Sequence, residues 1–226
     1  MNKKDVRAVI WDMDGVVADT GEQHYESWKY AFGRQGVDFR REDFLHVFGQ
    51  RNDTIIRKMM GEDVSDEIIQ QTARDKEEYF RESVVKDLKP LPGVIELLKV
   101  LAENGIAAAI ASSAPMENIQ VILRGLGIER YFQALVYGAE VSEGKPSPKI
   151  FLLAARKLGA EPSRCVVIED AVAGVTAAKR AGMRCIAVTN THPAESLREA
   201  DLVVDSLEKV SLHDLEKLFR EQITDK

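Results

Sequence analysis

The feature that most constrains the fold is an alternation of short apolar runs with longer amphipathic segments over the second half of the chain. It begins after the chain-breaking segment Lys89-Pro90-Leu91-Pro92-Gly93. We predict strands over residues 107–111, 135–137, 165–168, 185–188 and 202–204. Around them we predict helices over residues 94–104, 116–126, 148–158 and 172–181, and a last helix at the C-terminus. This alternation predicts an α/β fold, a Rossmann-like doubly wound parallel sheet with helices on both faces.

One further apolar run, over residues 7–11, precedes a long stretch without a convincing strand. Throughout that stretch the apolar residues recur at helical spacing within charged segments. We predict that it is an all-helical domain inserted after the first strand of the sheet. The expected division is a core of residues 1–18 and 88–226 and a helical domain of residues 19–87, joined by two hinge-like crossings.

Composition restricts the partners and the compartment. The chain has 226 residues, 31 of them basic and 37 acidic, with a net charge of −6 at pH 7. This argues against nucleic acid as a partner, because phosphate backbones select for a basic surplus. No apolar run approaches the roughly 18 residues that a membrane span needs, and the N-terminus lacks a signal-peptide pattern. We expect a cytoplasmic protein, a monomer by default, that binds no membrane and keeps Cys165 and Cys185 as free buried thiols.

Polar side chains gather where the predicted strands end. The carboxyl ends of parallel strands meet at one edge of a sheet, and ligands bind there. The residues at these ends are Asp12, Asp14, Ser112, Ser113, Lys145, Glu169 and Asp170. Asp12 and Asp14 are two residues apart and point the same way in an extended segment. Crowded carboxylates need a cation or a shared proton, and oxygen ligands suit Mg²⁺.

A charge count indicates how such a site could accept an anion. The four carboxylates carry more negative charge than Mg²⁺ and Lys145 together supply. A phosphate dianion would therefore be repelled unless one carboxylate is protonated. A carboxylic acid is also the group that a leaving alkoxide needs.

Four segments together resemble the haloacid dehalogenase superfamily, in its phosphatase and β-phosphoglucomutase branch. They are DMDGVVADT at 12–20, the serine pair at 112–113, GKPSP at 144–148 and IEDAVAGVTAAKRAG at 168–182. The predicted helical insertion is similar to the small helical cap of that family. The resemblance implies Asp12 as the nucleophile that forms an aspartyl phosphate, and Asp14 as the acid and base.

The same resemblance implies roles for the other strand ends. Ser112, Ser113 and Lys145 would bind the phosphoryl oxygens of a small phosphorylated metabolite. Mg²⁺ would be held by Asp12, the backbone carbonyl of Asp14, Glu169 and Asp170. Taken alone, the serine pair could instead cap the helix that follows it.

The helical insertion offers candidates that would choose the substrate. His24 and Trp28 are four residues apart, on one face of the first inserted helix, and could overhang the site or form a buried structural pair. Arg51 is a candidate for binding the distal part of the substrate, with a solvated arginine as the alternative.

The resemblance leaves three functions open. β-Phosphoglucomutases carry a Gly-x-Ser-Arg segment and a later cap lysine, whereas this chain reads Gly49-Gln50-Arg51-Asn52 and leaves the register of Lys76 undetermined. We therefore expect a Mg²⁺-dependent phosphatase of a sugar or polyol phosphate. A β-phosphoglucomutase-type phosphosugar mutase is the first alternative, and a non-catalytic binding protein on the same fold is the second.

Overall fold

The core of the molecule is one six-stranded parallel sheet with the strand order β3-β2-β1-β4-β5-β6. The computed structural model describes residues 6–224. The strands are β1 (Ala8–Trp11), β2 (Ala107–Ala111), β3 (Ala134–Val136), β4 (Cys165–Glu169), β5 (Arg184–Val188) and β6 (Leu202–Val204). Every neighbouring pair is parallel. The chain thus builds outward on both sides of β1, which confirms the predicted doubly wound α/β fold.

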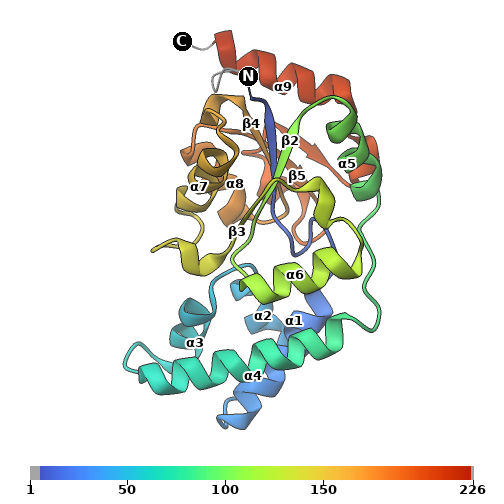
Figure 1. Cartoon of the computed structure of the whole chain (residues 1–226). Helices are drawn as coiled ribbons and strands as arrows, with labels where there is room; N and C mark the ends of the chain where they lie inside the picture. The colour runs from blue at the N-terminus through green and yellow to red at the C-terminus, as the bar shows by residue number, and fades with distance from the viewer. Residues whose placement is uncertain (1–5, 225–226) are drawn as a thin grey trace.

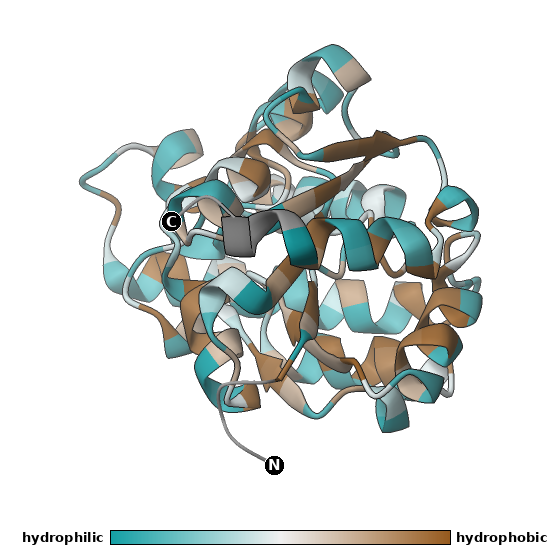
Figure 2. Ribbon diagram, turned by 90° about the horizontal axis from the view of Figure 1, so that it is seen from above, coloured by the Kyte–Doolittle hydropathy of each residue, from teal (hydrophilic) through white to brown (hydrophobic). Residues whose placement is uncertain are grey.

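Helices cover both faces of this sheet (Figure 1). They are α5 (Val94–Glu103), α6 (Met116–Gly125), α7 (Lys149–Leu158), α8 (Val172–Arg180) and α9 (Leu212–Thr224). Val9 and Trp11 of β1 pack with α5, α6 and α9, whereas Ala8 and Ile10 pack with α7 and α8. In Figure 2 the helices are banded brown and teal around largely brown strands, as expected of amphipathic helices on an apolar sheet.

The segment between β1 and α5 is helical, as predicted. It contains α1 (Gly21–Arg34), α2 (Arg41–Val47), α3 (Asn52–Met60) and α4 (Asp66–Val84), which we call the cap. These helices gather at the edge where the strands end (Figure 1). They have an apolar core of their own, with Trp28, Phe32, Phe39 and Phe44 buried in it. Across residues 6–224, no helix combines the length and the apolarity that crossing a bilayer requires.

The two crossings between sheet and cap lie side by side. Ala18 forms an isolated antiparallel bridge with Pro90, and the amide of Leu91 donates to the carbonyl of Val17 at 3.0 Å. Both segments of chain therefore leave the core at one place. This pairing supports the domain division predicted above, which we keep as a proposal.

The two cysteines are free and buried, which confirms that expectation. Burial raises the pKa of Cys165 to about 12, and it also raises the pKa of Cys185. Thiols, unlike thiolates, are poor nucleophiles and metal ligands. Neither cysteine is therefore a candidate for chemistry at neutral pH.

Candidate active site

Three of the predicted carboxylates meet at the carboxyl ends of β1 and β4. The amide of Asp12 donates to the carbonyl of Ile168 at 3.0 Å, so the pairing of the two strands continues to the carboxylate. Asp12, Glu169 and Asp170 each present an oxygen within 4.8 Å of the others, and all three side chains are buried. These strands lie at the centre of the sheet, where the direction of winding changes, which is the usual ligand position in such folds.

Lys145 bridges two of these carboxylates from the loop after β3. Its Nζ donates to Asp12 Oδ1 at 2.6 Å and to Glu169 Oε1 at 2.5 Å. Burial opposes the charge on the lysine, but the two carboxylates outweigh it and raise the pKa of Lys145 above its ordinary value. The site therefore keeps a fixed cation beside Asp12.

Two of these carboxyl groups, Asp12 and Asp170, have raised pKa values. Burial raises the pKa of Asp12 to about 7, with Lys145 opposing the rise and Glu169 adding to it. Burial, followed by the charges of Glu169 and Asp12, also raises the pKa of Asp170 well above its ordinary value. Oxygen donors in this number and spacing fit a hard divalent cation such as Mg²⁺.

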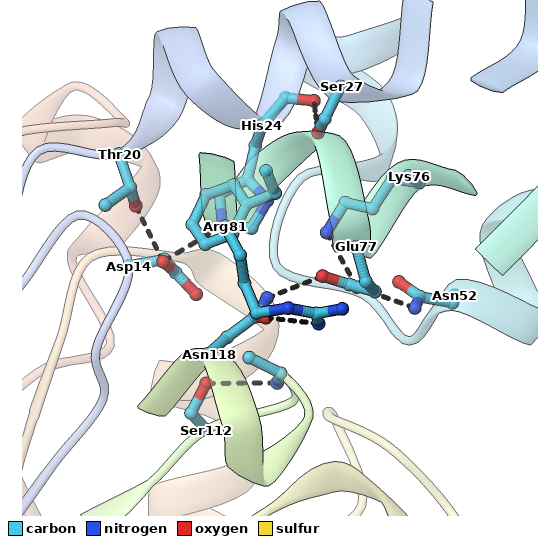
Figure 3. A network of polar contacts seen from close by, with 12 residues as sticks. Asp14, Thr20, His24, Ser27, Asn52, Lys76, Glu77, Arg81, Ser112 and Asn118 are labelled. Atoms are coloured by element: carbon cyan, nitrogen blue, oxygen red, sulfur yellow. Dashed lines mark hydrogen bonds and ion pairs between the residues drawn. The ribbon is translucent and has the colours of Figure 1, made fainter. Parts of the chain in front are cut away.

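Asp14 stands apart from this cluster and faces the cap. Its Oδ1 accepts a hydrogen bond from Thr20 Oγ1 at 2.6 Å and lies 3.0 Å from His24 Nε2 (Figure 3). Burial opposes ionisation of Asp14, but the charge of His24 and these contacts lower its pKa to about 2. The pKa values of Asp12 and Asp170 are thus raised, whereas the pKa of Asp14, the residue that the resemblance implies as the acid, is lowered.

Two glycines make room for the carboxylates. Gly15 has a φ of +80°, and a Cβ there would lie 2.0 Å from Asp170 Oδ2. A Cβ at Gly174 would lie 1.8 Å from Glu169 Oε1. Thr191, in the loop after β5, donates a hydrogen bond to Asp170. No motif in the sequence pointed to this threonine, because the loop after β5 carries no pattern of its own.

The serine pair lies at the end of β2, beside the carboxylates. Ser112 is buried, and its Oγ accepts a hydrogen bond from the amide of Ala114 at 3.1 Å. Helix α6 begins at Met116, with Pro115 as its N-cap residue and no side-chain cap. The alternative that a serine caps this helix is therefore wrong. Ser112 and Ser113 instead line a cavity between the sheet edge and the cap.

This cavity has about 450 Å³ of empty space, counting the part open to solvent. Asp12 and Asp14 line its floor together with the serine pair. The cap contributes apolar side chains and the ring of Trp28 to the lining. It also contributes polar side chains, which are His24, Gln50, Asn52, Lys76 and Glu77. The cavity thus joins the predicted reactive groups to side chains that could choose the substrate.

Arg51 does not line the cavity. Its Nη1 donates to the carbonyl of Val141 at 2.6 Å and to that of Gly138 at 3.2 Å, both in the core. Its Nε donates to Asp53 Oδ1 at 3.1 Å. The side chain is 24% exposed, so it is not a solvated arginine either. Arg51 is therefore a contact between cap and core and lies outside the lining of this cavity.

Comparison with known proteins agrees with this geometry. The sequence profile of haloacid dehalogenase-like hydrolases matches residues 6–182, which is most of the chain. The chain belongs to the haloacid dehalogenase-like hydrolase family. This confirms the resemblance carried by the four motifs.

The relatives within the family include both enzymes of the branch. β-Phosphoglucomutase of Bacillus subtilis (strain 168) is 33% identical over 216 residues, 92% of this chain and 92% of the relative. The phosphorylated carbohydrates phosphatase of Thermotoga maritima is 31% identical over 204 residues, 88% and 93% of the two chains. Protein SUPPRESSOR OF QUENCHING 1, chloroplastic, of Arabidopsis thaliana is 34% identical over 93% of this chain, which spans 20% of that protein.

Solved structures of the family superimpose over nearly the whole chain. β-Phosphoglucomutase from Clostridium difficile has a TM-score of 0.87 at 28% identity, covering 96% of this chain and 99% of the other. CbbY from Rhodobacter sphaeroides, in complex with xylulose-(1,5)bisphosphate, has a TM-score of 0.85 at 28% identity, covering 93% and 99%. The haloacid dehalogenase-like fold with a helical cap is thus shared along the chain.

Proposed function

We propose that the chain is a Mg²⁺-dependent phosphomonoester hydrolase that acts on a small phosphorylated metabolite, a sugar or polyol phosphate, through an aspartyl phosphate. The observation that carries this proposal is the meeting of Asp12, Lys145 and Glu169 at the sheet edge, with Asp14 across the cavity floor. The names of the relatives, a phosphorylated carbohydrates phosphatase among them, support the same chemistry and substrate class.

The residues that would hold Mg²⁺ are Asp12, Glu169, Asp170 and the backbone carbonyl of Asp14. Three of them already converge within 4.8 Å. The raised pKa values of Asp12 and Asp170 indicate a cluster that binds a proton where a metal ion is absent. Bound there, Mg²⁺ would neutralise carboxylate and phosphate charge and lower the barrier to attack.

In the first step the Asp12 carboxylate attacks phosphorus, and the ester bond to the leaving alcohol breaks. Lys145, which donates to Asp12 Oδ1, orients the carboxylate and neutralises the oxygens of the transferred group. Ser112 and Ser113 supply hydrogen bonds to those oxygens from the end of β2. Water then hydrolyses the aspartyl phosphate and restores Asp12.

Asp14 carries the proton for both steps. As a carboxylate it can deprotonate the attacking water, which is its second task. For the first task it must hold a proton, which it passes to the leaving oxygen and recovers from the attacking water in the second step. His24 Nε2 lies 3.0 Å from Asp14 Oδ1 and would hold the carboxylate in position.

The second candidate function is a phosphosugar mutase of the β-phosphoglucomutase type. It is favoured by the similarity to β-phosphoglucomutases. His24 and Trp28, which lie in the cavity wall, also match the histidine and tryptophan four residues apart that the resemblance to those mutases implies. A screen separates the candidates: sugar phosphates, p-nitrophenyl phosphate, and β-glucose 1-phosphate with a bisphosphate primer, each with Mg²⁺. Phosphate release supports the hydrolase, and isomerisation without release supports the mutase. If protein that binds Mg²⁺ shows neither phosphate release nor isomerisation, the non-catalytic binding protein is the remaining candidate.

Cytoplasmic location and a monomeric state stay predictions.

Replacing the nucleophile is the direct test of the mechanism. Asp12→Asn should abolish phosphate release and still give a folded protein, because asparagine fills the same space without the attacking oxygen. Steady-state turnover and thermal unfolding measure the two effects. Asp205→Asn, an exposed carboxylate paired with Lys209, is the matched control and should keep full activity. Retained turnover in Asp12→Asn would contradict the assigned nucleophile.

A further inference from the structure

The cap wall of the cavity contains a buried ion pair that the proposed chemistry does not use. Lys76 and Glu77 are neighbours in α4, and their side chains are 3% and 7% exposed. Lys76 Nζ lies 2.8 Å from Glu77 Oε1. The same ammonium lies over the rings of Trp28 and Phe80, at 5.4 and 5.1 Å from their centroids.

Glu77 is held in place by three donors from three helices. Besides Lys76, Asn52 of α3 donates to Oε1 at 2.7 Å, and Asn118 of α6 donates to Oε2 at 2.5 Å (Figure 3). Burial opposes its ionisation, but the charge of Lys76 and these hydrogen bonds lower the pKa of Glu77 below its ordinary value. A fixed carboxylate therefore faces the cavity next to the ammonium.

The basic side chains at the cavity already have interaction partners. Among the described residues that line it, the basic side chains are His24 and Lys76, and each lies against a carboxylate. Outside the lining, Arg51 donates to core carbonyls, and Arg81 donates to Asn118 Oδ1 at 3.2 Å. A second phosphate at this end would meet the Glu77 carboxylate without a free cation, and an unpaired anion is costly in a buried site.

Neutral hydroxyl groups suit the same wall. The amides of Gln50 and Asn52 can exchange hydrogen bonds with hydroxyls, and both line the cavity beside the ring of Trp28. We infer that Glu77 restricts the site to monophosphate esters of neutral, hydroxyl-bearing alcohols and excludes substrates with a second phosphate. This inference rests on the proposed phosphatase function. It sets the chain apart from the relative that binds a bisphosphate.

The wild-type protein provides the first test. We expect kcat/KM for fructose 1-phosphate to exceed that for fructose 1,6-bisphosphate by at least about tenfold, because the two differ only by the second phosphate. Equal values, or a preference for the bisphosphate, would overturn the inference. This comparison needs no variant, so it tests the exclusion of bisphosphates even if a substitution disturbs folding.

The second test removes the carboxylate. Glu77→Gln keeps the size of the side chain and frees the charge of Lys76, so the ratio of bisphosphate to monophosphate kcat/KM should rise by about tenfold or more. Glu78→Gln, the same change at the exposed neighbouring position, is the matched control and should leave the ratio unchanged. Thermal unfolding checks that both variants fold. A uniform loss on both substrates would show a merely structural role and would overturn the inference.

Different results would contradict the proposed function and the inference about Glu77. If the wild-type protein releases no phosphate from p-nitrophenyl phosphate or any sugar phosphate with Mg²⁺, the proposed function fails and the inference falls with it. If phosphate is released but the bisphosphate is used as well as the monophosphate, the phosphatase stands and only the role of Glu77 is lost.

Discussion

At the scale of single residues, the buried carboxylates of the site depend on neighbouring glycines, whose missing side chains leave room for them. Glu169 is fully buried and accepts a hydrogen bond from Lys145 only because Gly174, in the first turn of α8, leaves the space for its carboxylate. Asp170 depends on Gly15 in the same way. Glycine in a helix costs up to about 1 kcal/mol relative to alanine, and at Gly174 this cost is offset by a carboxylate that could not otherwise fit.

Gly174→Ala should therefore damage the site although alanine favours the helix. The added methyl would meet Glu169 Oε1 at 1.8 Å, so the carboxylate must leave Lys145. We expect kcat/KM to fall by at least about tenfold and stability to fall by roughly 1–3 kcal/mol from overpacking. Turnover and denaturant unfolding measure these effects.

Gly33→Ala is the matched control for this change. Gly33 also lies within a helix, α1, and a Cβ there has no neighbour within 4 Å. The substitution should leave activity unchanged and stability equal or slightly higher. Full activity of Gly174→Ala would contradict the packing argument for Glu169.

At the scale of elements, cap and core share an apolar contact, through Phe80 and Val84 of α4, and polar side chains that cross between them. Arg51 precedes α3 and binds carbonyls after β3. Glu77 of α4 binds Asn118 of α6. Polar contacts of this kind are more easily broken than an apolar interface, because water can replace each partner. In the proposed phosphatase they would suit a cap that opens to admit substrate and closes to exclude water.

Arg51→Met should loosen this closure. Hydrogen bonds from a charged group contribute ~1.5–3 kcal/mol when buried, and less here because the guanidinium is 24% exposed. We expect kcat/KM to fall by about tenfold, equally for all substrates. Hydrogen exchange should become faster in α3 and around Gly138 and Val141.

Arg57→Met is the control, since Arg57 lies in the same helix and contacts Glu62 and Asp66 within the cap. It should leave exchange in the core loop unchanged. If Arg51 instead bound the substrate, which is one of the two interpretations that the sequence left open, Arg51→Met would change the choice between substrates and leave that exchange unchanged.

At the scale of the whole molecule, the buried carboxylates tie stability to pH and metal. The pKa of Asp12 is about 7 in the folded protein, against an ordinary value of 3.8 for an aspartate in water. Between these values the folded state binds more protons than the unfolded state, so stability falls as pH rises through this window. The raised pKa of Asp170 acts in the same direction. Asp14 acts in the opposite direction, but its window, from about 2 to 3.8, is more acidic.

The metal-free protein should therefore have a lower Tm at about pH 8 than at about pH 5. Added Mg²⁺ should raise the Tm more at the higher pH, because protons compete with the metal for Asp12 and Asp170. Thermal scans with chelator and with Mg²⁺ at both pH values test this. Asp12→Asn should weaken the dependence on pH. A Tm of the chelated protein that rises with pH across this range would contradict the assigned pKa shifts.

The fold and the reactive centre were predictable from the sequence, because both are encoded locally. Apolar runs of strand length, separated by helical periods, specify a parallel sheet. In such a sheet every residue that follows a strand lies at the same edge. Asp12, Lys145, Glu169 and Asp170 could therefore be placed together before any contact was known.

The cap wall was decided only by the tertiary structure. Glu77 and Glu78 are adjacent acids in one helix, and helical periodicity does not say which of them faces the core side, yet one is buried and the other exposed. Likewise nothing local turns Arg51 toward Val141. The rotation of each cap helix and the closure of the cap depend on packing between segments far apart in the chain. The sequence by itself thus determined the fold and which polar side chains meet at the sheet edge, and the tertiary structure decided which charged side chains of the cap line the cavity.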